Sequence, residues 1–156
     1  MTLNPAWISI ANLLLCAMLK KLDHIGIAVD NLDISIKKYE QITGKKPGEK
    51  EVVAAQKVAT AFFPVGETRI ELLKGTHPDS PISKFIKTHG EGIHHICFEV
   101  ENLAQSKIEM SKTGLQFIEN ISEAGAGDSK VAFIHPKSTG GILIELVEYP
   151  KSAIDG

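Results

Sequence analysis

The chain has 156 residues, of which 43% are hydrophobic and 23% charged, and its formal net charge is -2. This composition is typical of a globular domain and excludes a disordered chain or a long membrane-spanning run. A pI near 6.3 argues against a dedicated nucleic-acid-binding protein. Cys16 and Cys97 are too few for a disulfide framework or a cysteine-based zinc site. We therefore expect a cytoplasmic protein without a nucleic-acid partner.

Residues 1–19 stand apart as an N-terminal extension that is almost entirely apolar from residue 6 onward. The apolar run is shorter than the roughly 17–25 residues of a spanning helix, and no basic residue precedes it as in a secretory signal. Two interpretations are open: an extension upstream of a true start at Met18, or a membrane anchor or short helix that packs on a partner. We favour the first and expect no membrane association.

A first module is predicted over residues 20–75. It begins with a strand at 22–29, where branched apolar residues alternate with other residues. Apolar side chains then recur at helical spacing over 31–44. The remaining elements are one or two strands within 51–66 and a further strand over 67–75.

A linker over residues 76–92, with a short helical stretch near Ile82–Ile86, leads to a second module over 93–150. The elements predicted in it are a strand over 93–100, a helix over 101–114, a strand and a glycine-rich loop within 115–129, and strands within 130–141 and 142–150. Both halves are therefore predicted as βαβββ modules, and together they form a single domain over residues 20–156.

The two modules are also related in sequence. LDHIGIAVDNLDISI at 22–36 aligns without gaps onto IHHICFEVENLAQSK at 93–107, which places His24 on His95. Near the module ends, TRIELL aligns onto ILIELV, which places Glu71 on Glu145. Such an internal repeat predicts two equivalent structural units, each with a histidine on its first strand and a glutamate on its last.

Two similar units that pack about an approximate two-fold axis would bring these two histidines and two glutamates together. Such a set suits a divalent ion of Co, Ni, Mn, Fe or Zn. Carboxylates within apolar strands are costly to bury without a partner, and the open alternative is that both glutamates face solvent at strand edges. Because successive side chains of a strand point to opposite faces, only one of His94 and His95 is expected in the site. The repeat selects His95 and predicts that His94 faces elsewhere.

Four stretches carry a family resemblance: LDHIGIAVDNLD, TRIELLKGTHPDSPISKFI, GEGIHHICFEVEN and FIHPKSTGGILIELVEYP. Over residues 20–150 the chain resembles the vicinal oxygen chelate superfamily, the glyoxalase, bleomycin resistance and dioxygenase group, and most of all its methylmalonyl-CoA epimerase family. The resemblance implies an α+β, glyoxalase-like fold of paired βαβββ modules with a metal site in the sheet concavity. The implied metal ligands are His24, Glu71, His95 and Glu145.

The resemblance also implies the reaction, a 1,1-proton transfer at C2 of methylmalonyl-CoA. It implies a divalent metal cofactor, with Co²⁺ favoured over Zn²⁺, Ni²⁺, Mn²⁺ or Fe²⁺, an acyl-CoA substrate and a homodimer. Glu145 is the expected catalytic acid or base on one face of the substrate. The second proton carrier stays open between Glu71, metal-bound water and another residue, because Thr60 aligns where some relatives have a carboxylate.

The candidates for binding the phosphates of CoA are Lys130, Lys137, Ser138 and the glycines Gly125, Gly127, Gly140 and Gly141, since lysines and backbone amides both hold anions. The alternative is that they are ordinary turn residues and solvated lysines. Two competing functions remain: glyoxalase I, which uses the same ligand types, and a metal-free small-molecule-binding protein of the same fold. The presence of all four ligand residues argues against the binding protein.

Overall fold

The computed structural model describes residues 19–151, and the predicted extension falls outside them except for Leu19. The first module contains β1 (Leu19–Ala28), α2 (Leu32–Thr43), β2 (Glu51–Val53), the 3-10 turn η2 (Ala54–Gln56), β3 (Val58–Val65) and β4 (Thr68–Gly75). Helix α3 (Pro81–His89) occupies the predicted linker. The second module contains β5 (Gly92–Val100), α4 (Leu103–Lys112), the turn η3 (Ala126–Asp128), β6 (Lys130–Ile134), the turn η4 (Pro136–Ser138) and β7 (Leu143–Glu148).

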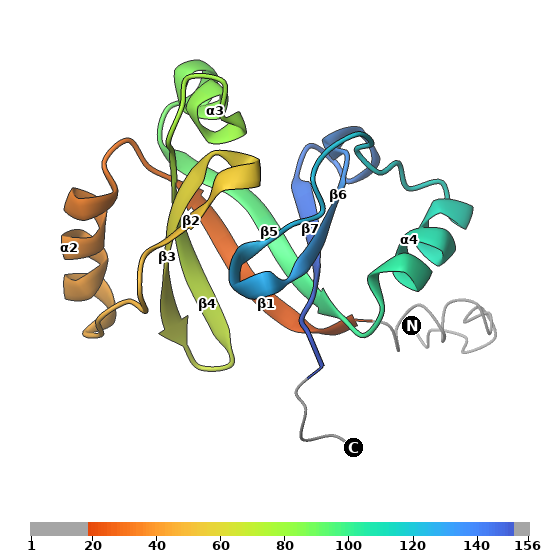
Figure 1. Cartoon of the computed structure of the whole chain (residues 1–156), viewed down its shortest axis with the longest axis horizontal. Coiled ribbons are helices and arrows are strands. Elements are labelled where there is room, and N and C mark those ends of the chain that lie inside the picture. Colours follow the sequence, from red (N-terminus) through yellow and green to blue (C-terminus); the bar gives the residue numbers. More distant parts are fainter. Residues whose placement is uncertain (1–18, 152–156) are drawn as a thin grey trace, which may run out of the picture.

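The seven strands form one mixed sheet in the order β2-β3-β4-β1-β5-β7-β6, which curls into a half-barrel (Figure 1). The central strands β1 and β5 are antiparallel, whereas β1 pairs with β4 and β5 pairs with β7 in parallel. The first strands of the two modules thus meet at the middle of the sheet, and the last strands flank them. This arrangement confirms the predicted glyoxalase-like fold of paired modules.

The two module helices begin in the same way. Asn31 precedes α2, and its Oδ1 accepts a hydrogen bond from the backbone N–H of Ile34 at 3.0 Å. Asn102 precedes α4, and its Oδ1 accepts one from Gln105 at 2.8 Å. These asparagines satisfy backbone N–H groups that have no partner inside a helix, so the repeat in sequence is also a repeat in helix capping.

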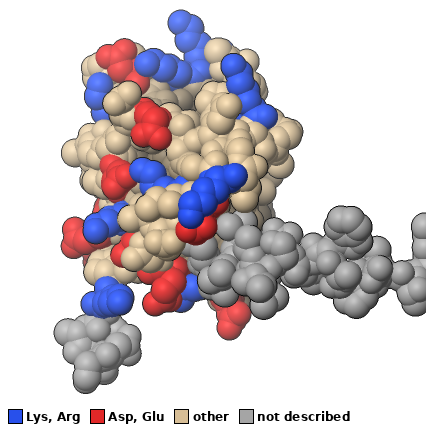
Figure 2. Space-filling model, turned by 90° about the vertical axis from the view of Figure 1, so that its right-hand side faces the viewer, with Lys and Arg blue, Asp and Glu red and all other residues tan. Residues whose placement is uncertain are grey.

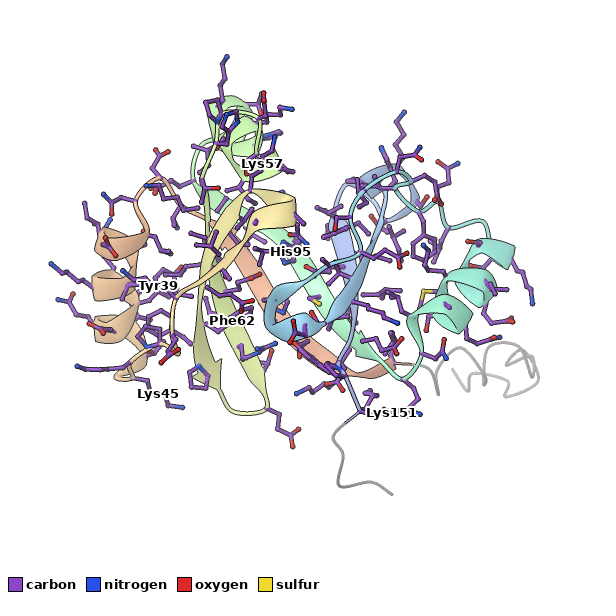
Figure 3. All side chains as sticks on the ribbon, in the orientation of Figure 1. Tyr39, Lys45, Lys57, Phe62, His95 and Lys151 are labelled. Atoms are coloured by element: carbon purple, nitrogen blue, oxygen red, sulfur yellow. The ribbon has the colours of Figure 1, made fainter. Side chains whose placement is uncertain are left out.

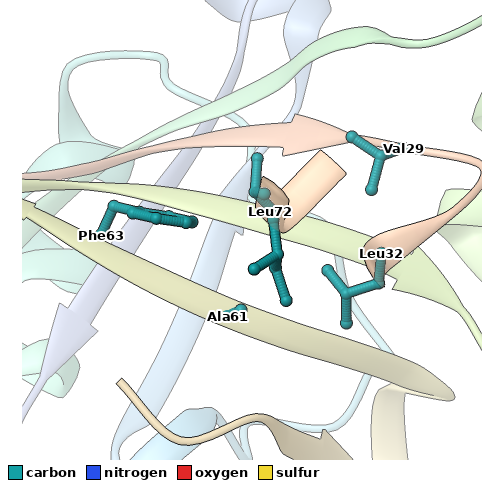
Figure 4. Close-up of a cluster of buried hydrophobic side chains, with 6 residues drawn as sticks. Val29, Leu32, Ala61, Phe63 and Leu72 are labelled. Atoms are coloured by element: carbon teal, nitrogen blue, oxygen red, sulfur yellow. The ribbon is translucent and has the colours of Figure 1, made fainter. Parts of the chain in front are cut away.

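Each module has its own hydrophobic core on the outer side of the half-barrel, beneath its helix. Figure 4 shows the first cluster, which brings together Leu32 of α2, Ala61 and Phe63 of β3 and Leu72 of β4. The second cluster consists of Val100, Leu103, Met110, Ala132, Ile134 and Leu146. Because the helices occupy the outer faces, the inner face of the sheet is left to line a cavity.

The strand predicted within 115–129 is not formed. The structure contains only two isolated bridges there, Phe117 with Ile134 and Ala124 with Lys130. The backbone turns into the left-handed region at Asn120, Gly127 and Asp128, with φ values of 59°, 60° and 57°. Extended pairing cannot continue through such positions, so the second module keeps a loop where the first has β2.

The distribution of charged side chains and the length and polarity of the helices agree with the composition of a globular domain. On the face in Figure 2, Lys and Arg side chains lie among Asp and Glu side chains. Within residues 19–151, no helix is both long enough and apolar enough to cross a membrane.

Candidate metal centre

Four side chains from four adjacent strands meet on the inner face of the half-barrel. They are His24 of β1, Glu71 of β4, His95 of β5 and Glu145 of β7. The Nε2 atoms of the two histidines lie 3.0 Å apart. Glu71 Oε2 lies 3.1 Å from His24 Nε2 and 3.4 Å from His95 Nε2, and Glu145 Oε2 lies 3.7 and 2.9 Å from the same two atoms. All four residues are buried, with 3–7% of their surface exposed, so neither glutamate faces solvent.

Strand register explains why these side chains converge. Gly26 on β1 stands opposite Glu71 on one side and His95 on the other. Cys97 on β5 stands opposite both His24 and Glu145. Gly26 and Cys97 each follow a histidine by two residues, on the same face of the strand, and both are small. The two small residues thus leave space for the larger side chains beside them, and His95 occupies the space over Gly26.

The donor set fits a small divalent cation. Ligand atoms held at about 2.1 Å from one ion lie roughly 3.0 to 3.4 Å apart when they are neighbours in octahedral or tetrahedral geometry. The distance between the two Nε2 atoms and the distances from them to the two carboxylate oxygens run from 2.9 to 3.7 Å, close to this range. Three of the side chains, His24, His95 and Glu145, also have ligand atoms that all lie within 4.8 Å of one another. Two imidazoles and two carboxylates suit the borderline divalent metals.

The electrostatics of the cluster favour positive charge at its centre. Burial lowers the pKa of His95, but the charge and hydrogen bond of Glu145 outweigh burial and raise that pKa to about 9. The pKa values of both glutamates lie below their usual range, because the neighbouring histidines oppose the effect of burial. A divalent cation would balance the negative charge of the two carboxylates, as the protons on the imidazoles do.

Each candidate ligand histidine is contacted at its Nδ1 atom by the residue that precedes it in the sequence. His24 Nδ1 donates a hydrogen bond to Asp23 Oδ2 at 2.7 Å, and His95 Nδ1 lies 3.0 Å from His94 Nδ1. The prediction that His94 faces away from the site is wrong. The strand register shifts by one residue at His94, as in a β-bulge, which breaks the alternation of faces on which the prediction relied.

Thr60 also has a definite place. Its hydroxyl donates a hydrogen bond to Glu71 Oε1 at 2.8 Å, and both residues are buried. Thr60 thereby holds the Glu71 carboxylate with Oε2 toward the two histidines. The sequence indicated only that Thr60 aligns with a carboxylate of some relatives, and it did not predict this hydrogen bond.

A cavity of about 780 Å³ opens above the cluster, and all four candidate ligands line it. Apolar side chains such as Phe62, Phe133 and Leu143 make up much of its wall. His95 and Phe62, both labelled in Figure 3, line this cavity.

Of the residues predicted to bind the phosphates of CoA, Gly125 and Gly127 line this cavity, whereas Lys130, Lys137, Ser138 and Gly140 do not. Lys130 begins β6, Lys137 and Ser138 lie in η4, and Gly140 lies in the turn before β7. The structure does not bring them to the metal cluster. Lys57 does line the cavity, and sequence reasoning missed it.

Other residues that shape the site were also missed. Asp23, Arg69 and Tyr149 form a network behind His24, and Arg69 and Tyr149 line the cavity as well. One signal was present in the sequence, since Arg69 is the only arginine and lies two residues before Glu71 on the same strand. No pattern in the sequence connects it to Asp23, which is 46 residues away.

The chain is similar to known proteins over most of its length. The profile of the Glyoxalase/Bleomycin resistance protein/Dioxygenase superfamily matches residues 23–133. An uncharacterized protein of Bacillus subtilis is 38% identical over 130 residues, covering 83% of this chain and 93% of that protein. The mitochondrial methylmalonyl-CoA epimerase of Homo sapiens is 35% identical over 129 residues, covering 82% of this chain and 73% of that protein.

A solved structure is similar over nearly the same length. A variant of Streptomyces coelicolor methylmalonyl-CoA epimerase, in complex with 2-nitronate-propionyl-CoA, superposes with a TM-score of 0.79 at 31% identity. The match covers 87% of this chain and 96% of the other chain.

Proposed function

Because this chain belongs to the glyoxalase/bleomycin resistance protein/dioxygenase superfamily, we propose that it is an isomerase that interconverts (2R)- and (2S)-methylmalonyl-CoA. The observation that carries the proposal is the buried set of two histidines and two glutamates at the floor of a cavity. Relatives named as methylmalonyl-CoA epimerases, which match most of this chain, support the choice of substrate.

We propose that His24, Glu71, His95 and Glu145 hold a divalent metal ion, with Co²⁺ favoured. When bound, the ion would supply Lewis-acid stabilisation of the negative charge that develops on the thioester oxygen of the substrate. The protein's own part is to present two buried imidazole nitrogens 3.0 Å apart, each with a carboxylate oxygen of Glu71 and one of Glu145 within 3.7 Å of it.

Proton transfer at C2 needs a group that accepts the proton on one face and one that returns a proton on the other. Glu145 is proposed as the first of these groups: its carboxylate takes the C2 proton, and the electron pair of the C–H bond moves toward the thioester carbonyl. Glu71 is the candidate for the second group, and its carboxylate would return a proton to C2 only after it has itself taken one up. Thr60 anchors Glu71 through Oε1, which leaves Oε2 directed toward the centre of the cluster.

The cavity is proposed to take the acyl group and the adjoining part of the CoA chain. Its volume of about 780 Å³ lies in the range usual for small-molecule sites. Lys130, Lys137, Ser138 and Gly140 remain proposed for the phosphates, which would lie beyond the cavity. Alanine variants of Lys130 and Lys137 should then raise KM for methylmalonyl-CoA while kcat changes little.

Two further properties are proposed from the sequence: a homodimer and a cytoplasmic location. The sheet ends at β2 on one side, and strand edges favour pairing with another chain, whereas the outer edge of β6 bonds to the segment before it through the bridges of Phe117 and Ala124. Sedimentation of the purified protein would decide its oligomeric state.

The proposed activity is tested by incubating the metal-loaded protein with (2R)-methylmalonyl-CoA before and after treatment with a chelator. Appearance of the 2S form that stops after chelation is expected. Formation of lactoylglutathione from methylglyoxal and glutathione, without epimerisation, would instead identify glyoxalase I.

The role of Glu145 is tested by Glu145→Gln, which keeps the shape of the side chain but removes the proton acceptor. We expect kcat to fall by at least about 100-fold. Metal content is measured in parallel, and Glu49→Gln, at an exposed loop position, serves as the matched control. If metal is retained and exchange of the C2 proton with solvent is unchanged, Glu145 has no part in the proton transfer.

A further inference from the structure

The residue before each candidate ligand histidine is the extra residue of a register shift in the central strand pair. Leu22 pairs with Phe98 and His24 with Cys97, so Asp23 has no partner of its own on β5. Farther along the same pair, Gly26 stands opposite His95 and Ile27 opposite Ile93, so His94 is the extra residue on β5. A bulge redirects side chains that would otherwise alternate between faces. Both extra residues thereby reach the Nδ1 side of the histidine that follows them.

The contact from Asp23 determines which nitrogen of His24 faces the cavity centre. The Asp23 carboxylate is almost fully buried and lies 2.7 Å from His24 Nδ1. The Arg69 guanidinium contacts the same Oδ2 and pairs with this carboxylate as an anion. An ionised carboxylate can only accept, so Nδ1 carries the proton. The Nε2 lone pair of a neutral His24 then points toward Glu71 and Glu145.

Asp23 is itself held by two residues from distant parts of the chain. Arg69 Nη2 on β4 contacts Asp23 Oδ2, and the Tyr149 hydroxyl after β7 donates to the same oxygen at 3.1 Å. Arg69 also contacts the Tyr149 hydroxyl. The three side chains therefore form a closed network around one carboxylate oxygen. Such a network holds the carboxylate in a single orientation.

Phe62 completes the enclosure of His24. The Arg69 guanidinium lies 4.2 Å from the centre of the Phe62 ring, and that ring packs edge to face on His24 at 5.4 Å. Arg69 is thus held both by charge and by an aromatic face. The His24 ring is bounded by Asp23 on its Nδ1 side and by Phe62 beside it.

We propose that Asp23, braced by Arg69 and Tyr149, is a positioning residue that fixes the ring orientation and tautomer of His24 for metal binding. His94 has the corresponding place beside His95, with an imidazole instead of a carboxylate. The two ligand histidines are therefore not equivalent: the one backed by Asp23 is the more basic donor. This inference rests on the metal site of the proposed function and does not depend on the identity of the substrate.

The first test measures the affinity of the full-length, metal-depleted protein for Zn²⁺ by competition with a chromophoric chelator. Asp23→Asn should weaken Zn²⁺ binding by about 10- to 100-fold, the usual effect of removing such an outer partner. Asp33→Asn is the matched control, because Asp33 is an exposed aspartate on α2 that pairs with Lys50. Equal affinity of Asp23→Asn and the wild type would overturn the proposal.

A second pair of variants changes the network less, so that it still tests the proposal if Asp23→Asn fails to fold. The chain has two tyrosines, so Tyr149→Phe removes a hydroxyl from the network and Tyr39→Phe removes one from α2, far from the site in Figure 3. Tyr149→Phe should weaken Zn²⁺ binding a few fold, whereas Tyr39→Phe should leave it unchanged. Equal effects of the two variants would contradict the proposal.

A spectroscopic measurement separates positioning from general destabilisation. In the ¹⁵N-labelled, Zn²⁺-loaded protein, the Nδ1 proton of His24 should give a downfield signal that exchanges slowly with solvent. It should shift in Tyr149→Phe, disappear in Asp23→Asn and stay unchanged in both controls. A signal unchanged in Asp23→Asn would overturn the proposal. If the wild type binds Zn²⁺ but does not epimerise methylmalonyl-CoA, the proposed substrate fails while these binding results still decide the role of Asp23.

Discussion

Gly26 and Cys97 are the small residues around which the four candidate ligands are arranged. A Cβ atom on Gly26 would lie 2.2 Å from Cε1 of the His95 ring, so no other residue fits without displacing that ring. Cys97 is fully buried opposite His24 and Glu145, and burial raises the pKa of its thiol to about 12. It therefore acts as a small apolar residue at the floor of the site.

We predict that Gly26→Ala moves the His95 ring and thereby disrupts the metal site. Zn²⁺ affinity should fall at least about tenfold, and the free energy of unfolding should fall by about 1–3 kcal/mol from overpacking. Gly48→Ala is the control, since a Cβ there meets nothing within 4 Å. Titration with Zn²⁺ and denaturant unfolding of both variants check the prediction, and normal Zn²⁺ binding by Gly26→Ala would refute it.

At the scale of elements, the same devices occur once in each module. Both module helices start at an asparagine cap, and each of the two central strands carries a register shift next to its ligand histidine. The caps follow directly from local sequence, because an asparagine side chain reaches N–H groups two or three residues ahead. The register shifts depend instead on how β1 and β5 pair, which neither strand determines alone.

We predict that the two caps contribute similarly to stability. Asn31→Ala and Asn102→Ala should each lower the free energy of unfolding by about 1 kcal/mol, because each leaves helix N–H groups without an acceptor. Asn31→Asp keeps the acceptor oxygen and should remain close to the wild type. Urea unfolding measures all three variants, and an unchanged midpoint for both alanine variants would contradict the prediction.

At the scale of the whole molecule, the candidate metal site joins the two modules. His24 and Glu71 come from the first module, and His95 and Glu145 come from the second. The modules also meet where the half-barrel closes. There Glu51 Oε1 accepts a hydrogen bond from the backbone N–H of Gly127 at 2.9 Å, and the Gln56 side chain donates one to Ala124 O at 2.8 Å. These contacts tie the loop of the second module over the cavity to the first.

We predict that metal removal lowers the stability of the entire fold, because the ligands come from both modules. At Zn²⁺ one hundred times above its dissociation constant, binding adds about 2.7 kcal/mol. In a chain of this size, chelation should then lower Tm by about 5–10 °C. Calorimetry with and without a chelator checks this result. A double variant His24→Ala and His95→Ala should show no response to the chelator.

The paired modules, the helix starts and the four candidate ligands could all be predicted from the sequence. Those features depend on short-range patterns: periodicity within 8–14 residues, caps beside their helices, and a repeat that needs no knowledge of contacts. Glu71 and Glu145 were recognisable because a carboxylate within an apolar strand is expensive to bury without a partner.

Tertiary structure alone decided the position of His94, the loop in place of a strand at 115–129, the space over Gly26 and the network behind His24. The physical reason is the separation of the partners along the chain. Asp23 is 46 residues from Arg69 and 126 from Tyr149, and no local pattern encodes such contacts. A register shift between β1 and β5 likewise exists only once the two strands are paired, and that pairing turns Asp23 and His94 toward the histidines beside them.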